Sequence, residues 1–455
     1  MADTGENVNL SRARICIDFG TARSKASVCL DPTLPLEVGV KPLPVGAVSR
    51  AQHALLTPSV LYVDGGRIFF GPLALEYAQR GAAQGRDPLL SFKTVLGARD
   101  AAAILAQKMR PSVDPTGTLT HRDALVLYLA YLDQLIREAL AVTQGMPPGV
   151  AEVKRRYTSP VWKAGNGPDR VFEAIFNESA AVSQKLGRLF LSAEGISIAQ
   201  CKDALDKAIQ LPGNGRLETG VFEPHAAAAA SLAFTTAPTN FVLVFDIGAG
   251  TTDVAAFEFD ERTNPPALTE ITEARQCSGL AGDEIDRILI EHYFRRRGGD
   301  PSQAEEQRVL RMFKLSAREL KQQLFAHGKV ILRTGGWNTT TIKLSDLTDD
   351  PQFREYQAAL TRIIAASLTP VVQRAQAVGA QVIDVVLAGG GSHLPFLPDL
   401  VRAAAAQNPR SVPLRVSPLS PASKLYDGVD PALGGAFPQI AMSVGGALIE
   451  MMPAA

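Results

Sequence analysis

The chain has 455 residues, which is enough for two to four folding units rather than one small module. Hydrophobic residues make up 46% of it and charged residues 20%, a balance that excludes a disordered or collagen-like chain. Lysine and arginine together count 46, as do aspartate and glutamate, so the net charge is zero and no basic footprint of a nucleic-acid binder is indicated.

The cysteines and the N-terminus bear on the compartment. The four cysteines, at positions 16, 29, 201 and 277, form no CxxC pair and no zinc spacing, so we expect structural thiols in a reducing environment. Residues 1–13 form a polar leader without the apolar segment of an export signal, and no apolar run approaches the roughly 18 residues that cross a bilayer. These patterns predict a cytoplasmic protein with neither a membrane nor a nucleic-acid partner.

Two apolar stretches near the N-terminus, 15–17 and 26–30, flank the turn DFGTARS and predict a hairpin. Further elements predicted in this half are a strand over 57–63, helices over 73–83 and 121–143, a strand over 154–162, and helices over 168–187 and 226–233. The pair Glu223-Pro224 is expected to end the preceding element just before the last of these helices.

A second hairpin of the same design is predicted halfway along the chain. The most apolar strand candidate, 241–245, runs into the turn DIGAGTTD and resumes at 254–257. Two such copies indicate an internal duplication in which each half supplies one phosphate-facing turn. The remaining pattern is typical of α/β layers: charged helical sequence over 283–326, a strand pair over 329–344, a long helix over 352–378, and a buried strand over 383–387 that leads into glycines.

The two turns have the composition that phosphate binding requires. Glycine lets backbone N–H groups approach a triphosphate closely, and threonine adds hydroxyl donors. Each turn carries an acid, Asp18 or Asp246, and Asp253 follows the second turn. Carboxylates beside phosphates make sense only with a cation between them, and Mg²⁺ prefers oxygen ligands and keeps several waters. A plain hairpin is the alternative for either turn alone, but not for both together.

Neither GxxxxGK[ST] nor a GxGxxG that opens a helix after a strand is present, so phosphate-loop and dinucleotide folds are disfavoured. The chain instead resembles the actin-like ATPase superfamily: DFGTARS, FDIGAGTTD and LAGGGSHLP are similar to its first phosphate, second phosphate and adenosine motifs. Within the superfamily it most resembles the ATPase domain of the seventy-kilodalton heat-shock chaperones. Further matches, all in the family's order, are TPSV at 57–60, FKTVLG at 92–97, TSPVW at 158–162, EPHAAA at 223–228 and AGDEID at 281–286.

The resemblance covers about residues 14 to 449 and implies an α/β fold of two lobes, which are duplicated ribonuclease-H-like domains around a central nucleotide cleft. Lobe I would span 14–238, with a subdomain at about 50–118. Lobe II would span 239–455, with a subdomain at about 276–350. The segment before the EPHAAA motif is longer than in the family, which predicts an insertion over 163–215.

The resemblance also implies roles for single residues. Lys93, in FKTVLG, would reach the γ-phosphate, and Glu223, in EPHAAA, would help to place the attacking water. The other predicted catalytic residues are Asp246 and Thr251, and the residues predicted to hold Mg²⁺, mostly through water, are Asp18, Asp246 and Asp253. The predicted nucleotide contacts are Asp18, Gly20, Thr21, Ala22, Gly248, Ala249, Gly250, Thr251, Gly282, Asp283, Lys321, Gln322, Phe325, Gly389, Gly390, Gly391, Ser392 and His393.

Several of these positions depart from the family pattern. His393 and Gln322 stand where the family has arginine, Phe325 replaces a serine, Ala249 replaces a glycine and Ala22 replaces a hydroxyl residue. The first three changes lie in the adenosine site. We therefore expect adenine stacking to be rebuilt, with Phe325 as the candidate, and the motifs leave ATP and another nucleoside triphosphate both open.

The function implied by the resemblance is a slow ATPase that uses MgATP, releases ADP and phosphate, and works as a chaperone-like switch. The linker and the β-rich peptide-binding domain of the chaperones are not expected in this chain. The output is therefore predicted to run through an unidentified partner or client protein that docks near Pro224 and the 163–215 insertion.

Two other functions remain open at this level. A filament-forming bacterial actin-like protein shares the EPxAAA and GGDxxD motifs, although FKTVLG and the chain length argue against it. A small-molecule kinase of the same fold would need an aspartate base beside an acceptor pocket, and no segment identifies one. The alanine- and arginine-rich composition is typical of a bacterial source.

Overall fold

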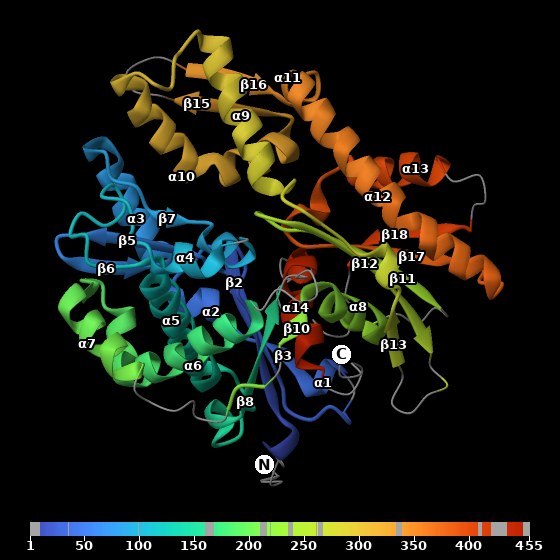
Figure 1. The fold of residues 1–455 in the computed structure, drawn as a ribbon, viewed down its shortest axis with the longest axis horizontal. Coiled ribbons are helices and arrows are strands. Elements are labelled where there is room, and N and C mark those ends of the chain that lie inside the picture. Colours follow the sequence, from blue (N-terminus) through green and yellow to red (C-terminus); the bar gives the residue numbers. More distant parts are fainter. Residues whose placement is uncertain are drawn as a thin grey trace.

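The structure is a computed structural model, and its fold is made of two halves that face each other (Figure 1). It describes residues 10–34, 36–98, 100–159, 168–209, 216–218, 220–234, 240–260, 262, 267–333, 339–407, 412–419 and 435–448. Several predicted segments lie outside these residues, namely most of the leader, 160–167 and 210–215 around the insertion, and the lobe boundary at 238–239.

The first half is built on a six-stranded sheet with the order β10-β8-β1-β2-β3, and β4 also pairs with β2. Its strands are β1 (Arg14–Asp18), β2 (Arg23–Cys29), β3 (Val40–Pro42), β4 (Thr57–Pro58), β8 (Lys154–Ser159) and β10 (Val221–Phe222). Strands β1 and β2 form the predicted antiparallel hairpin around DFGTARS, whereas β8 runs parallel to β1 and β10 runs parallel to β8.

The second half repeats this arrangement in a six-stranded sheet with the order β13-β12-β11-β17-β18, and β14 also pairs with β12. Its strands are β11 (Phe241–Ile247), β12 (Thr252–Asp260), β13 (Ala267–Glu270), β14 (Gln276–Ser278), β17 (Ile383–Ala388) and β18 (Leu414–Pro418). Strands β11 and β12 form the second predicted hairpin, and β17 and β18 follow in parallel. The same order of hairpin and parallel strands in both sheets bears out the duplication that the two turns predict.

Two smaller sheets extend the halves. One has the order β7-β5-β6-β9, and the other is the pair β15-β16 at the top of Figure 1. Their strands are β5 (Val60–Asp64), β6 (Arg67–Phe70), β7 (Leu89–Leu90), β9 (Ile196–Ser197), β15 (Lys329–Arg333) and β16 (Thr339–Lys343). Strand β9 comes from the segment predicted as an insertion, and its pairing with β6 ties that segment to the first half.

The helices follow the predicted pattern with two refinements. They are α1 (Leu36–Gly39), α2 (Val45–Ser49), α3 (Gly71–Gly81), α4 (Ala101–Ala106), α5 (His121–Val142), α6 (Pro168–Leu186), α7 (Ile198–Ala208), α8 (Glu223–Phe234), α9 (Gly282–Arg297), α10 (Ala304–His327), α11 (Leu344–Thr348), α12 (Pro351–Ala377), α13 (Leu397–Ala406) and α14 (Phe437–Ala447). The charged pattern over 283–326 divides into α9 and α10, because α9 ends at the left-handed Gly298. Of the described helices, none is both long and apolar enough to cross a bilayer.

The second refinement is the start of α8. The expectation that Glu223-Pro224 would end the preceding element is wrong, because β10 ends at Phe222 and α8 begins with Glu223 itself. Proline is favoured in the first turn of a helix, where its missing N–H has no partner to lose. Glu223 is therefore placed by the first turn of a helix rather than by a loop.

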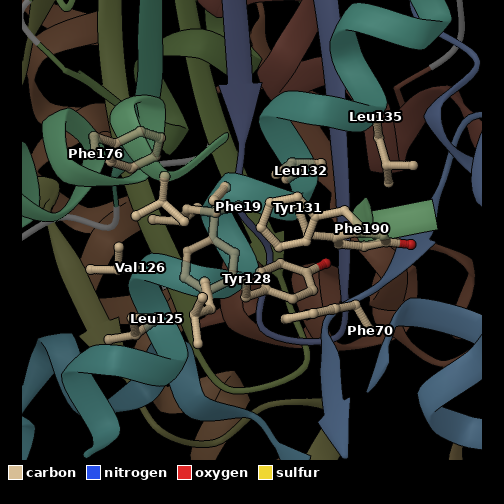
Figure 2. Packing of buried hydrophobic residues seen from close by; sticks show 14 of the residues in the cluster. Phe19, Phe70, Leu125, Val126, Tyr128, Tyr131, Leu132, Leu135, Phe176 and Phe190 are labelled. Atoms are coloured by element: carbon tan, nitrogen blue, oxygen red, sulfur yellow. The ribbon is translucent and has the colours of Figure 1, made fainter. Parts of the chain in front are cut away.

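Aromatic side chains fill the core of the first half around α5 (Figure 2). Tyr131 stacks on Phe70 with ring centroids 5.3 Å apart, and Tyr128 lies 5.6 Å from Phe19. Phe19 belongs to the DFGTARS turn and is fully buried. The packing of α5 therefore anchors the first turn to the core.

Helices α8 and α14 pack against each other between the two large sheets (Figure 1). Helix α14 contacts β1 and β2, and α8 contacts β11 and β12, so the pair joins the halves. A Cβ atom at Gly445 would lie 1.7 Å from the carbonyl oxygen of Ala226, and one at Gly446 would lie 2.4 Å from Cys16 Sγ. Only glycine at position 445 permits so close an approach of the two helix backbones, and glycine at 446 leaves room for the Cys16 side chain of β1.

We predict that Gly445→Ala lowers the midpoint of thermal unfolding by at least about 5 °C, because the added methyl group must push α14 away from α8. Gly279→Ala is the matched control, since a Cβ atom there meets nothing within 4 Å. Differential scanning fluorimetry of both variants and the wild type tests this. Equal midpoints for the two variants would show that the close contact between α8 and α14 does not determine the thermal stability.

Candidate functional site

A cavity of about 450 Å³ lies where the two hairpin turns meet. It is lined by residues that are far apart in the sequence but that the motifs assign to one site. The predicted site residues in its wall are Asp18, Gly20, Thr21, Ala22, Lys93, Glu223, Asp246, Gly248, Ala249, Thr251, Gly282, Lys321, Gln322, Phe325, Gly389, Gly390, Gly391 and His393.

Four predicted site residues lie outside this wall. Gly250 lies between the turns, since a Cβ atom there would be 2.8 Å from Thr94 Cγ2 and 3.0 Å from Thr21 Cγ2. Asp253 is fully buried on β12, paired in register with Asp246. Ser392 turns its hydroxyl inward and donates to the Gly389 carbonyl at 2.8 Å.

The fourth, Asp283, faces away from the cavity. Its carboxylate accepts a hydrogen bond from Ser91 Oγ at 2.8 Å and another from Arg318 Nη2 at 3.2 Å. These contacts lie in the wall of a second, neighbouring cavity. The side chain of Asp283 is therefore held by Ser91 and Arg318 in this structure, and its nucleotide contact stays a prediction.

Backbone hydrogen bonds hold the second turn in place. Gly248 N–H donates to the Thr251 carbonyl at 2.9 Å, which closes the turn. Gly282 N–H donates to the Gly248 carbonyl at 3.1 Å, and Asp283 N–H donates to the Ala249 carbonyl at 2.8 Å. The start of α9 is thereby fastened to the turn, so the two move as one unit.

The first turn is held by Ser59, which directly follows β4, and by the core. Ser59 Oγ donates to the Gly20 carbonyl at 2.7 Å, and Ser59 N–H donates to the Ala22 carbonyl at 2.9 Å. A Cβ atom at Gly20 would lie 2.1 Å from the Arg23 carbonyl oxygen, so this position requires glycine. Phe19 contacts Phe92 at 5.7 Å between ring centroids, which places the neighbouring Lys93 beside the turn.

Two ion pairs lie in the site, and little of either is exposed to water. Lys93 Nζ donates to Glu223 Oε1 at 2.5 Å, and Lys25 Nζ lies 2.7 Å from Asp18 Oδ2. Burial opposes the charged form of Lys93, but Glu223 and then Asp18 outweigh burial, so the pKa of Lys93 is raised. Lys93 is therefore an ammonium ion at neutral pH.

For the carboxyl groups of the second hairpin, burial and nearby charges favour the neutral form. Burial first, and then the charges of Glu223 and Asp253, raise the pKa of Asp246 well above its ordinary value. Burial and Glu223 raise the pKa of Asp253 to about 6, although hydrogen bonds from Cys277 and Thr251 oppose the rise. A carboxylate so disfavoured when charged is stabilised by any cation that enters beside it.

The donor set fits a hydrated Mg²⁺ ion. Four buried carboxyl groups face two ammonium groups, so full ionisation leaves a net charge of −2. Asp246 Oδ1 is buried without a hydrogen-bond partner among the described residues. Within the described part of the chain no three such side chains converge as direct ligands. Mg²⁺ keeps several of its waters, so an ion here would meet the carboxylates through them.

The glycine-rich segment after β17 packs directly on the second turn. Gly389 has a φ of 77°, and a Cβ atom there would lie 2.2 Å from Asp246 Oδ1. A Cβ atom at Gly391 would lie 2.5 Å from Ile247 Cγ2. These glycines therefore let the predicted adenosine segment approach the acid of the phosphate turn, which any side chain would prevent.

Helix α10 forms the facing wall. Lys321 Nζ donates to the Gly282 carbonyl at 2.7 Å and lies 2.9 Å from Asp286 Oδ1, so it is held by α9. The Phe325 ring packs 6.0 Å from Phe396 and also borders the cavity. His393 Nε2 lies 2.8 Å from the Gly435 carbonyl oxygen, which fixes its ring at the rim.

The fold and the site define the class of protein: a two-lobed actin-like protein, as the motifs predict. Residues 209–412 match the family model described as Hsp70 protein, so this part of the chain is an Hsp70-family domain. The resemblance inferred from the motifs is thereby confirmed over this segment. The match contains Glu223, the second turn, α9, α10 and the glycine-rich segment, but neither the first turn nor Lys93.

Two curated relatives agree with this assignment. The chain is 26% identical over 179 residues to the chaperone protein HscA of Enterobacter sp. (strain 638). It is equally similar, over the same length, to the chaperone protein HscA of Escherichia coli O17:K52:H18 (strain UMN026 / ExPEC). In both cases the match spans 39% of this chain and 27% of the relative.

The motifs did not reveal every charged residue of the site. Lys25 was missed, although a symmetrical hairpin around DFGTARS places it directly opposite Asp18, and that register could have been derived. Arg23 and Arg318 were also missed, and they border both cavities. No sequence signal links them, because only the folded chain brings the first turn close to α10.

We predict that the contribution of Asp253 to the stability of the metal-free protein is lost as the pH rises from about 4 to about 7, because Asp253 holds its proton more tightly when folded than when unfolded. Asp253→Asn removes that group. The free energy of unfolding of this variant, relative to that of the wild type, should therefore rise by about 2 kcal/mol between about pH 4 and about pH 7. Urea unfolding in EDTA at several pH values measures the difference, with the exposed Asp64→Asn as control. A difference that is constant with pH would contradict the raised pKa of Asp253.

Proposed function

We propose that the protein binds a nucleoside triphosphate together with Mg²⁺, ATP in the first instance, and hydrolyses it slowly to the diphosphate and phosphate. The observation that carries this proposal is the buried Lys93–Glu223 pair, which lies in the same cavity as both Gly/Thr turns. Transfer of a phosphoryl group to water needs a cation near the phosphate oxygens and an acceptor that positions the water. Lys93 supplies the cation, and Glu223 supplies the acceptor that positions the water.

The arrangement of the cavity supports one orientation of the nucleotide. The two turns offer backbone N–H groups and the hydroxyls of Thr21 and Thr251 to the phosphates. The base would lie between α10, which contributes Phe325, and the glycines at 389–391. In this orientation Lys321, held by α9, lies near the ribose.

The pair would be separated when the triphosphate enters. Lys93, whose raised pKa keeps it charged, would exchange Glu223 for an oxygen of the γ-phosphate, and the freed Glu223 carboxylate would hold the attacking water. Bound Mg²⁺, held through its waters by Asp18, Asp246 and Asp253, would neutralise charge on the phosphate oxygens. Hydrolysis then depends on positioning and charge rather than on a covalent intermediate.

We further propose that closure of the two halves around the nucleotide is passed to a partner protein. The relatives carry the name chaperone, which supports an output of this kind. Glu223 and Pro224 form the first turn of α8, and α8 packs on α14 between the halves, so a change at Glu223 can shift both helices. Because Pro224 is buried, it would transmit such a shift from below the surface rather than contact the partner itself.

Nucleotide binding is tested by calorimetric titration of ATP with Mg²⁺, supported by thermal shift. Saturating ligand at about one hundred times its dissociation constant should stabilise the protein by about 3 kcal/mol. We expect the affinity for ATP to fall when Mg²⁺ is chelated, because the buried carboxylates then repel the phosphates. The absence of heat and of any thermal shift at millimolar ATP with Mg²⁺ would refute the proposal. Competition with GTP identifies the preferred base.

Hydrolysis is tested with Lys93→Gln and Glu223→Gln, each of which replaces a charged side chain by a neutral polar one. Each should slow single-turnover hydrolysis by about ten- to a thousandfold, as losses of transition-state positioning do. The double variant should be hardly slower than the slower single variant, because the two groups act as a unit. Lys207→Gln, at an exposed lysine on α7, is the control. Unchanged rates in Lys93→Gln would remove Lys93 from the site.

A further inference from the structure

A second cavity of about 730 Å³ adjoins the first. Its walls come from the segment around His53, from α3, and from the facing sides of α9 and α10, so it lies between the extensions of the two halves. Four residues border both cavities: Ala22, Arg23, Leu56 and Arg318. The two cavities therefore meet at a junction that carries two guanidinium groups.

Arg23, the first residue of β2, has no hydrogen bond and no ion pair from its side chain to any described residue. Burial lowers the pKa of Arg23, and the charge of Arg318 lowers it further. Its charge also lowers the pKa of His53, after the larger effect of burial. Arg23, His53 and Arg318 all border the second cavity, so the half-buried guanidinium of Arg23 shares this wall with a second cation.

None of the acids in the wall of the second cavity is available to neutralise Arg23, because each already has another partner. These pairs are Asp283 with Ser91 and Arg318, Asp286 with Lys321, Glu291 with Arg287, Glu76 with Arg80, and Glu319 with Gln323. Lys314, a cation in the same wall, is exposed to water and needs no such partner. Arg23 is therefore the half-buried cation of this wall whose side chain makes no ion pair with a described residue.

The neighbouring groups favour an anion at this position. Arg318 donates from Nη2 alone, to Ser91 Oγ at 3.1 Å and to Asp283, so its other N–H groups have no partner among the described residues. His53 Nδ1 accepts from Leu55 N–H at 3.2 Å, which leaves Nε2 as the protonated nitrogen of the neutral ring. Guanidinium groups bind phosphate oxygens with two parallel hydrogen bonds, which an ammonium group cannot do.

We propose that Arg23 and Arg318 bind a phosphate group at the junction of the two cavities. The inference rests on the proposed nucleotide site, in which Lys321 lies near the ribose, because Arg318 precedes Lys321 by one turn of α10 and borders the same cavity. This phosphate has two possible sources. The bound nucleotide can carry it on its ribose 2′- or 3′-hydroxyl, or it can belong to a separate ligand in the second cavity.

The experiment compares nucleotides that differ by one phosphate. AMP, adenosine 2′,5′-bisphosphate and adenosine 3′,5′-bisphosphate are titrated calorimetrically into the wild type, Arg23→Gln and Lys314→Gln. We expect one bisphosphate to bind the wild type about tenfold or more tightly than AMP. That ratio should fall below about threefold in Arg23→Gln and persist in Lys314→Gln, which removes an exposed cation from the same wall.

A second arm detects a separate phosphate. Inorganic phosphate is titrated with and without AMP-PNP, whose three phosphates fill the positions between the hairpin turns. Binding that persists with AMP-PNP and is lost in Arg23→Gln assigns the junction to a separate ligand. If neither arm depends on Arg23, the inference is wrong, whereas failure of AMP-PNP and ADP to bind the wild type refutes the proposed function instead.

Stability distinguishes a binding arginine from a structural one. Because Arg23 has no counter-charge, ligand-free Arg23→Gln should unfold at the wild-type temperature or about 1–4 °C above it. A structural arginine would lose stability on the same change, so a clear fall in that temperature, or failure to fold, overturns the inference. Arg23→Lys keeps the charge but not the paired donors, and it should recover only part of the preference for the bisphosphate.

Discussion

The contact between α8 and α14 is the constraint on which the site depends. Because Gly445 has no side chain, the two helices approach until their backbones touch, and the sheets on either side are held at the corresponding separation. Helix α8 begins with Glu223, and α14 contributes Gln439 and Met442 to the wall of the nucleotide cavity. One helix crossing therefore sets both the width of the cavity and the position of the carboxylate that meets Lys93.

The charges in the cavity are divided between the halves. Asp18, Lys25 and Lys93 come from the first half, Asp246 and Asp253 come from the second, and Glu223 lies on the helix between them. Carboxyl groups from both halves thus face each other across the cavity, and the raised pKa of Asp246 reflects its burial first and that crowding second. A cation bound between them would draw the halves together, so under the proposed function ligand entry and the relative position of the halves would be linked through the same charges.

The sequence predicted the two hairpins and their turns because the signal is local and occurs twice. Apolar strand, acid, glycine and threonine lie within a few residues of one another, so no tertiary information is needed to find them. The direction of the Asp283 side chain could not be predicted in the same way, because Ser91 and Arg318, which hold it, come from distant parts of the chain. The start of α8 was misplaced because Pro224 ends some elements and begins others.

The buried and half-buried cations of the site separate into two kinds once the fold is known. Lys25 and Lys93 each face a carboxylate of the chain, so the ligand-free protein can hold them without an external anion. Arg23 faces no such group, and withdrawing part of an unpaired charge from water costs free energy that folding alone does not return. The simplest reason to keep a residue that lowers the stability of the ligand-free protein is that a ligand supplies its counter-charge. Sequence motifs could assign Lys93 but not Arg23, because the missing ion pair of Arg23 becomes visible only when the acids in the wall of the second cavity have been assigned their own partners.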